Sequence, residues 1–195
     1  MNLTLDFCNY KTTKYAVENY HYSKRLPGGK LFYLGVWEDG NFIGSIVFGK
    51  SVNINLGTPY GLKHTEVCEL ARVALKEHKT PVTKIIKIAL AILKRNCPGI
   101  KLVISYADSN QGHLGKIYQA GNWIFTGYSN STSLYYLNGR YWHQRSIGQK
   151  GYITKNWLGL KKPQNKKFRY LYALDGKIKE SISKLKKEYP KALVV

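Results

Sequence analysis

The chain has 195 residues, with 31 Lys and Arg against 11 Asp and Glu, which gives a formal net charge of +20. Four Trp, sixteen Tyr and six Phe within a 44% hydrophobic composition exclude a disordered chain and predict a sizeable core. The absence of any 18-residue apolar run excludes a transmembrane helix, and the excess of cations favours an anionic partner.

The first half of the sequence predicts four strands, two of them joined as a hairpin, and one helix. Alternating apolar residues predict a strand over 2–8, and a helix follows over 11–20. An Asp39-Gly40 turn joins strand-like runs over 31–37 and 42–48, which is typical of a hairpin. A further strand is expected over 65–75.

The best helical pattern begins at Thr80-Pro81, with Thr80 as the N-cap and Pro81 at the first helical position. After a strand over 101–106, the apolar face formed by Leu114, Ile117 and Tyr118 predicts a short helix. Gly121 suits a left-handed cap at the end of that helix, and a new strand begins at Trp123.

A strand over 133–137, a basic segment and a Lys-rich helix over 178–188 complete the predicted order. This order predicts an α/β fold with a central mixed, mostly antiparallel twisted sheet flanked by helices. We expect one catalytic domain over 1–138 and a basic, aromatic-rich extension over 139–195 that packs on the same domain.

The extension has cations interleaved with aromatic residues, and no carboxylate lies between Asp108 and Asp175. Lysine and arginine bind phosphates through counterion release, and aromatic rings stack on bases. Nucleic acid is therefore the expected partner; a basic surface with no specific partner is the alternative. The residues expected to contact DNA are Arg140, Arg145, Lys161, Lys162, Lys166 and Lys167.

Several polar residues are candidates for chemistry. His21 ends the first helix and suits a base near neutral pH, although a surface role is the commoner one. Arg72 lies inside a strand and must be paired, for example with Glu69 or Glu66, or directed into a site. Asp108 and His113 follow a strand end, where α/β folds place ligands. Together with His21 they also form an N/O set that suits iron.

Several strings in the chain resemble a known family. They are His21-Tyr22-Ser23, Glu69-Leu70-Ala71-Arg72, Ser105-Tyr106-Ala107-Asp108, Gly112-His113-Leu114-Gly115, Ile117-Tyr118-Gln119-Ala120 and Asn122-Trp123. The short helix that ends Tyr-x-x-Gly resembles the closing half of a GNAT acyltransferase domain. The whole set resembles the phage Mom DNA-modification family, which has a GNAT-like fold.

The resemblance implies an enzyme that converts adenine in DNA to its carbamoylmethyl (acetamido) derivative and so protects phage DNA from host restriction. It implies that the active site is formed by His21, Tyr22, Arg72, Asp108 and Tyr118. We expect the flipped adenine to stack on Tyr22 or Trp123. The alternatives are a conventional GNAT N-acetyltransferase that uses acetyl-CoA and a non-enzymatic basic DNA-binding protein.

The residues expected to bind the group donor are Ser105, Glu69, Lys84, Thr83 and His113. In a GNAT domain the start of the long helix cradles the pyrophosphate of acetyl-CoA, but here residues 76–83 lack the usual glycine-rich turn. The expected donor is acetyl-CoA or another acyl or glycine-derived species, with iron as an option.

The three cysteines are far apart in the sequence and odd in number, which predicts reduced thiols and no structural zinc site. No secretory signal is visible at the N-terminus. These features predict a protein of the host cytoplasm, a monomer or homodimer, with no membrane partner.

Overall fold

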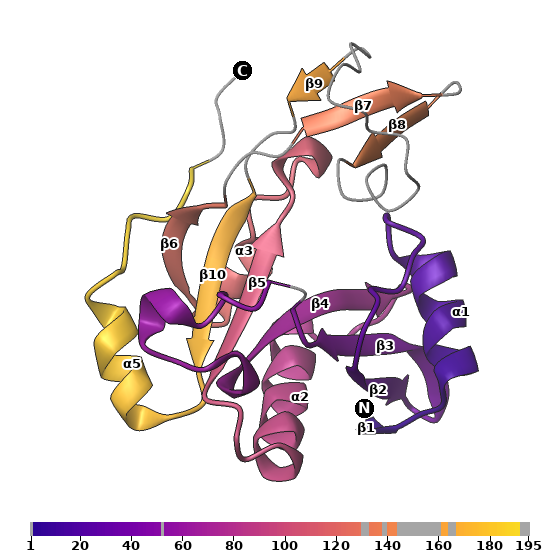
Figure 1. The fold of residues 1–195 in the computed structure, drawn as a ribbon. Helices are drawn as coiled ribbons and strands as arrows, with labels where there is room; N and C mark the ends of the chain where they lie inside the picture. The colour runs from indigo at the N-terminus through magenta and orange to yellow at the C-terminus, as the bar shows by residue number, and fades with distance from the viewer. Residues whose placement is uncertain are drawn as a thin grey trace.

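The computed structural model describes residues 2–51, 53–129, 133–137, 140–143, 161–163 and 167–191. These segments form a seven-stranded sheet with helices on its faces and a separate three-stranded sheet (Figure 1). None of the described helices has the length and apolar character needed to cross a membrane. All three cysteines are free thiols.

The large sheet has the order β1-β2-β3-β4-β5-β10-β6, and only the pair β4–β5 is parallel. This mixed, mostly antiparallel sheet confirms the predicted fold class. Its strands are β1 (Leu3–Phe7), β2 (Leu31–Glu38), β3 (Asn41–Gly49), β4 (Val67–Leu75), β5 (Leu102–Ala107), β10 (Phe168–Ala173) and β6 (Ile124–Tyr128).

Helices cover both faces of the sheet, as the alternation along β3 shows. Ile46 packs in the cluster that contains the buried face of α2, whereas its neighbour Val47 packs with Ala16 and Val17 of α1. Consecutive strand residues point to opposite faces, so α1 and α2 lie on opposite sides. The helices are α1 (Tyr10–Tyr20), α2 (Val82–Asn96), α3 (Lys116–Ala120) and α5 (Gly176–Ser183), with short 3-10 turns at Thr58–Tyr60, His64–Glu66 and Ser109–Gln111.

The predicted hairpin between β2 and β3 is confirmed. Asp39 and Gly40 both have positive φ, 49° and 78°, as a two-residue turn of type I′ requires. Glu38 and Asn41 are the last pair of the ladder. The turn therefore fixes Glu38 at the end of β2.

Strand β10 lies in the sheet between β5 and β6, although its residues belong to the segment that the sequence assigns to a basic extension. Tyr170 and Leu171 are fully buried there, so this part of the segment contributes to the main core. The division of the chain at residue 138 stays a prediction. A second sheet lies beyond the end of β5 (Figure 1) and consists of β8 (Arg140–His143), β7 (Ser133–Leu137) and β9 (Lys161–Pro163).

Three local predictions were wrong. Helix α2 begins at Val82 with Pro81 as its N-cap, because the hydroxyl of Thr80 donates to Glu38 instead of capping the helix. Gly121 has a φ of −87°, and the left-handed residue after α3 is Asn122, with a φ of +58°. The last helix ends at Ser183, five residues before the predicted end.

Candidate functional site

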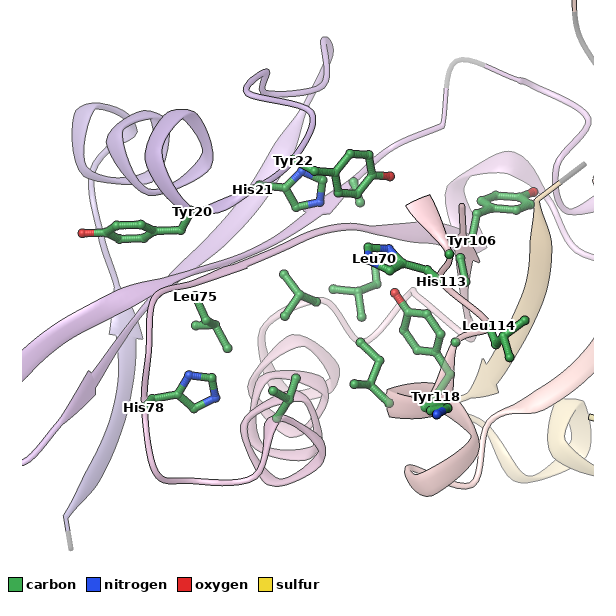
Figure 2. A pocket seen from close by; sticks show the side chains of 18 residues that line it. Tyr20, His21, Tyr22, Leu70, Leu75, His78, Tyr106, His113, Leu114 and Tyr118 are labelled. Atoms are coloured by element: carbon green, nitrogen blue, oxygen red, sulfur yellow. The ribbon is translucent and has the colours of Figure 1, made fainter. Parts of the chain in front are cut away.

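The candidate site is a cleft where β4 and β5 separate. The two strands pair over only three positions, of which Glu69 with Ile104 is the last. Beyond that point β4 turns away, and a cavity of about 640 Å³ opens between the strands, α3 and the end of α1. Figure 2 shows its lining, which includes Tyr20, His21, Tyr22, Leu70, Ala71, Val73, Tyr106, His113, Leu114 and Tyr118.

A β-bulge lies in β4 at the edge of this cleft. Two successive positions of β3, Val47 and Phe48, pair with Arg72 and Leu70, so Ala71 is the extra residue. Bulges bend a strand and leave a residue out of the ladder, and they are frequent next to active sites. Here the bulge coincides with the point at which β4 leaves β5.

The side chain of Ser105 bridges the gap where the two strands part. Its hydroxyl lies 2.9 Å from the carbonyl oxygen of Leu70 and 2.8 Å from the hydroxyl of Tyr118. A carbonyl only accepts and a hydroxyl has one proton, so Ser105 donates to Leu70 and accepts from Tyr118. These two hydrogen bonds fix the hydroxyl of Tyr118 at the wall of the cleft.

The ring of Tyr118 is held among aromatic side chains. It lies 5.1 Å from the rings of both Trp123 and Tyr170, and only 8% of the residue is exposed. Burial raises the pKa of Tyr118 to about 12, against a smaller opposing effect of Ser105. Figure 2 shows its hydroxyl pointing away from α3. Tyr118 therefore presents a protonated hydroxyl at neutral pH.

His21 is neutral and its tautomer follows from its neighbours. The backbone N–H of Ser23 donates to Nδ1 at 3.1 Å, so Nδ1 accepts and the ring proton lies on Nε2. Burial, together with the charges of Arg72 and His113, lowers the pKa of His21 to about 4. His21 therefore offers an N–H donor throughout the physiological pH range.

Tyr22 is stacked on His21, with ring centroids 4.4 Å apart, and meets His113 edge-on at 5.6 Å. Its side chain is 46% exposed, so one part of the ring is accessible at the rim of the cleft. Burial of the remainder, and the charge of Asp108, raise the pKa of Tyr22. The three rings form an aromatic wall opposite Tyr118.

Arg72 lies on β4 close to this wall. Its Nε donates to the carbonyl of Arg25 at 2.9 Å, and a second guanidinium nitrogen donates to the carbonyl of Ala71 at 2.7 Å. Glu66, one of the two carboxylates expected beside Arg72, instead pairs with Lys101 at 2.6 Å. The guanidinium thus connects β4 to the loop after α1.

Asp108 lies at the end of β5 and forms an ion pair. Lys167 Nζ lies 3.3 Å from its carboxylate, and the residue is only 6% exposed. The pairing joins β5 to the start of β10 and gives Lys167 a partner within the protein. Of the other cations expected to contact DNA, Arg145 and Lys166 lie outside the described residues. Arg140, Lys161 and Lys162 lie on β8 and β9, where only the backbone is described.

The residues expected to bind the donor do not all meet at one place. His113 lines the cleft, Ser105 lies behind it, and Glu69 precedes the separation of β4 and β5. Thr83 and Lys84 line a second cavity, also of about 640 Å³, between α2 and α3. Among the described residues, no three His, Cys, Asp or Glu side chains gather as a metal site, so the iron option gains no support.

Trp123 is 1% exposed and packs against Tyr118 and Tyr172, so a DNA base has no access to its ring. The expectation that adenine stacks on Trp123 was therefore wrong. Burial of this residue follows from its position immediately before β6, under α3.

Sequence reasoning missed one buried carboxylate, Glu38 at the end of β2, because no local pattern marks it. Its oxygens accept hydrogen bonds from the backbone N–H groups of Lys79 and Thr80, at 2.9 and 2.7 Å. These groups lie immediately before α2, where the GNAT resemblance places the pyrophosphate of acetyl-CoA. The N–H groups of Lys79 and Thr80 are already occupied and Pro81 has no N–H, so these three positions do not fit a coenzyme A diphosphate.

Solved structures with the same fold are N-acetyltransferases. A probable acetyltransferase from Staphylococcus epidermidis aligns with a TM-score of 0.53 and 9% identity, over 89% of this chain and 100% of that one. An N-acetyltransferase from Staphylococcus aureus Mu50 has a TM-score of 0.51 and 10% identity, over 89% and 99%. NAA60 from Arabidopsis thaliana, in complex with a bisubstrate analogue, aligns with a TM-score of 0.53 and 10% identity, over 89% of this chain and 100% of that one. The chain thus has the fold of the GNAT N-acetyltransferases.

The sequence comparison is narrower. A model of the Mom protein family matches residues 2–191, and the chain belongs to that family. The methylcarbamoylase mom of Escherichia phage Mu is 28% identical over 178 residues, which span 86% of this chain and 73% of that protein.

Proposed function

We propose that this protein transfers a carbamoylmethyl group to the exocyclic amine of adenine in double-stranded DNA, and that this modification protects phage DNA from host restriction. The observation that carries the proposal is the cleft between β4 and β5, where a chain of the Mom family brings together His21, Tyr22 and Tyr118. The relative from phage Mu is named a methylcarbamoylase, which supports the transferred group.

The cleft suits a single base outside the duplex. Its volume of about 640 Å³ is within the usual range for small-molecule sites. An enzyme that acts on a base atom must take that base out of the stack and hold it against aromatic or apolar side chains. The half-exposed ring of Tyr22 at the rim serves as that platform.

The exocyclic amine of adenine is a weak nucleophile because its lone pair is delocalised into the ring. In the proposed step the amine bonds to the methylene carbon of the transferred group, the bond from that carbon to the leaving group breaks, and the amine loses a proton. Asp108, which pairs with Lys167 just beyond β5, is the residue we assign to accept that proton. His21 Nε2–H is one donor that stabilises negative charge on the leaving group, and the hydroxyl of Tyr118 becomes the second by turning its proton from Ser105 into the cleft.

The test is nucleoside mass spectrometry of DNA from cells that express the protein. We expect a deoxyadenosine derivative heavier by one carbamoylmethyl group, and none from cells that express Tyr118→Phe. Soluble, folded protein that leaves all deoxyadenosine unmodified would contradict the proposal. Acetylation of a small amine, with unmodified DNA, would instead identify a conventional acetyltransferase.

A further inference from the structure

Glu38 makes an unusual set of contacts for a strand-end carboxylate. It is 8% exposed, although it lies next to the exposed turn between β2 and β3. One oxygen accepts from the N–H of Lys79 at 2.9 Å. The other accepts from the N–H of Thr80 at 2.7 Å and from its hydroxyl at 2.5 Å. Three donors from the loop before α2 are thus directed at one internal anion.

This loop is the place where an external anion would bind in the fold. The first N–H groups of a helix and of the loop before it attract phosphate groups, and glycines there let a phosphate approach the backbone. Here the loop over 76–80 has no glycine, and Pro81 removes one further donor. Thr80 is only 2% exposed, so its hydroxyl is not accessible from outside.

The charge of Glu38 reinforces this effect. Hydrogen bonds from the hydroxyl of Thr80 and the N–H of Lys79 lower the pKa of Glu38 to about 2. The carboxylate is therefore ionised at every physiological pH. A diphosphate that approached Lys79 and Thr80 would meet a fixed negative charge and donors that are already used.

We infer that Glu38 is a specificity-determining residue that closes the diphosphate position of the fold, so the chain takes a donor that places no diphosphate at the start of α2. Only the transferable group of that donor would enter the cleft between β4 and β5. The inference rests on the proposed function only in assuming that a donor binds there. It excludes acyl coenzyme A esters held in the manner of this fold.

The test measures binding of acetyl-CoA and of ADP to the full chain by calorimetry. The wild-type protein is compared with Glu38→Ala and with Glu77→Ala, which removes an exposed carboxylate from the same loop. Glu77→Ala controls for charge alone, since a chain of net charge +20 attracts any polyanion. We expect Glu38→Ala to bind ADP about tenfold more tightly than wild type, the effect of freeing donors for one charged hydrogen bond. Glu77→Ala should change affinity much less.

Equal gains in the two variants would overturn the inference, as would wild-type binding of acetyl-CoA that ADP displaces. If Glu38→Ala does not fold, Glu38→Gln takes its place, because it keeps the side-chain volume and one acceptor while removing the charge. Amide hydrogen exchange of wild-type Lys79 and Thr80 gives an independent answer: it should be unchanged by acetyl-CoA or ADP, and slower exchange would show that the ligand binds there. These measurements do not depend on DNA modification, so they fail or succeed separately from the proposed function.

Discussion

Tyr118 keeps its proton because it is buried, and the hydroxyl of Ser105 fixes where that proton points. If Tyr118 gives its proton to a leaving group, Ser105 is in place to donate to the phenolate that forms, since the 2.8 Å contact works in both directions. The pair therefore suits a proton donor whose phenolate is stabilised by a hydrogen bond until a proton returns from solvent.

Tyr118→Phe should abolish most of the modification while the fold is kept. The change removes one hydroxyl and leaves the ring between Trp123 and Tyr170. General acid catalysis contributes typically ~10²–10⁴-fold in rate, whereas the lost hydrogen bond costs about 1 kcal/mol of stability. Nucleoside analysis beside circular dichroism melts separates the two effects, with the exposed Tyr128→Phe as a control. Full modification by Tyr118→Phe would remove this residue from the mechanism.

The lowered pKa of His21 predicts a pH dependence with a definite sign. Its pKa falls from an ordinary 6.5 to about 4 in the folded chain, so between these values the unfolded chain binds the extra proton. The neutral, buried state of His21 therefore adds fully to the free energy of unfolding above pH 6.5, and this stabilisation is lost as the pH falls towards 4. In denaturant titrations from pH 7 to 4, the free energy of unfolding should depend less steeply on pH for His21→Gln than for the wild-type protein. His78→Gln, which replaces another histidine of the cleft, should keep the wild-type slope.

At the scale of elements, Gly115 determines how closely α3 packs on the sheet; it precedes the helix and has a φ of +77°. A Cβ there would lie 2.3 Å from the buried ring of Tyr170. Gly115→Ala should therefore lower stability by about 2–5 kcal/mol, through left-handed strain and a clash. Gly112→Ala has the same strain, with a φ of +68°, but no atom within 4 Å, so it should cost only about 1–2 kcal/mol. Equal melting temperatures for the two variants would contradict this role of Tyr170.

Much of this element scale is predictable from the sequence, because local patterns determine it. The Asp39-Gly40 turn lies within a few residues of the two strands that it joins, and it was predicted correctly. The grouping of His21, Tyr22 and Tyr118 came from the family resemblance, and all three line one cleft. Their catalytic roles stay predictions.

What could not be predicted depends on contacts between distant parts of the chain. Strand β10 lies in the sheet between β5 and β6 although it begins 40 positions after the end of β6, and no local periodicity indicates that place. Glu38 bonds to Thr80 across 42 positions, which is why Thr80 was wrongly predicted as a helix cap. Asp108 pairs with Lys167, a distant residue in the sequence that immediately precedes β10.

At the scale of the whole molecule, the net charge of +20 is the strongest indication of a polyanionic partner. Not every cation is available for such a partner, because some are paired within the fold. Lys101 pairs with Glu66 and Lys167 with Asp108. Lys167 should therefore contribute less to DNA affinity than the other cations of the basic segment, and more to the position of Asp108.

The basic segment should supply phosphate contacts that are largely independent of DNA sequence. A variant with alanine at Arg140, Lys161, Lys162 and Lys166 should bind duplex DNA more weakly, because each lost phosphate contact lowers the slope of log affinity against log salt by roughly 0.9. The matched control removes the same charge from exposed lysines after α5, with alanine at Lys184, Lys186, Lys187 and Lys191. If net charge alone attracted DNA, the slope of log affinity against log salt would fall by the same amount in both variants. A loss confined to the first variant would locate the DNA surface on the basic segment, and a loss confined to the second would move that surface to the end of α5.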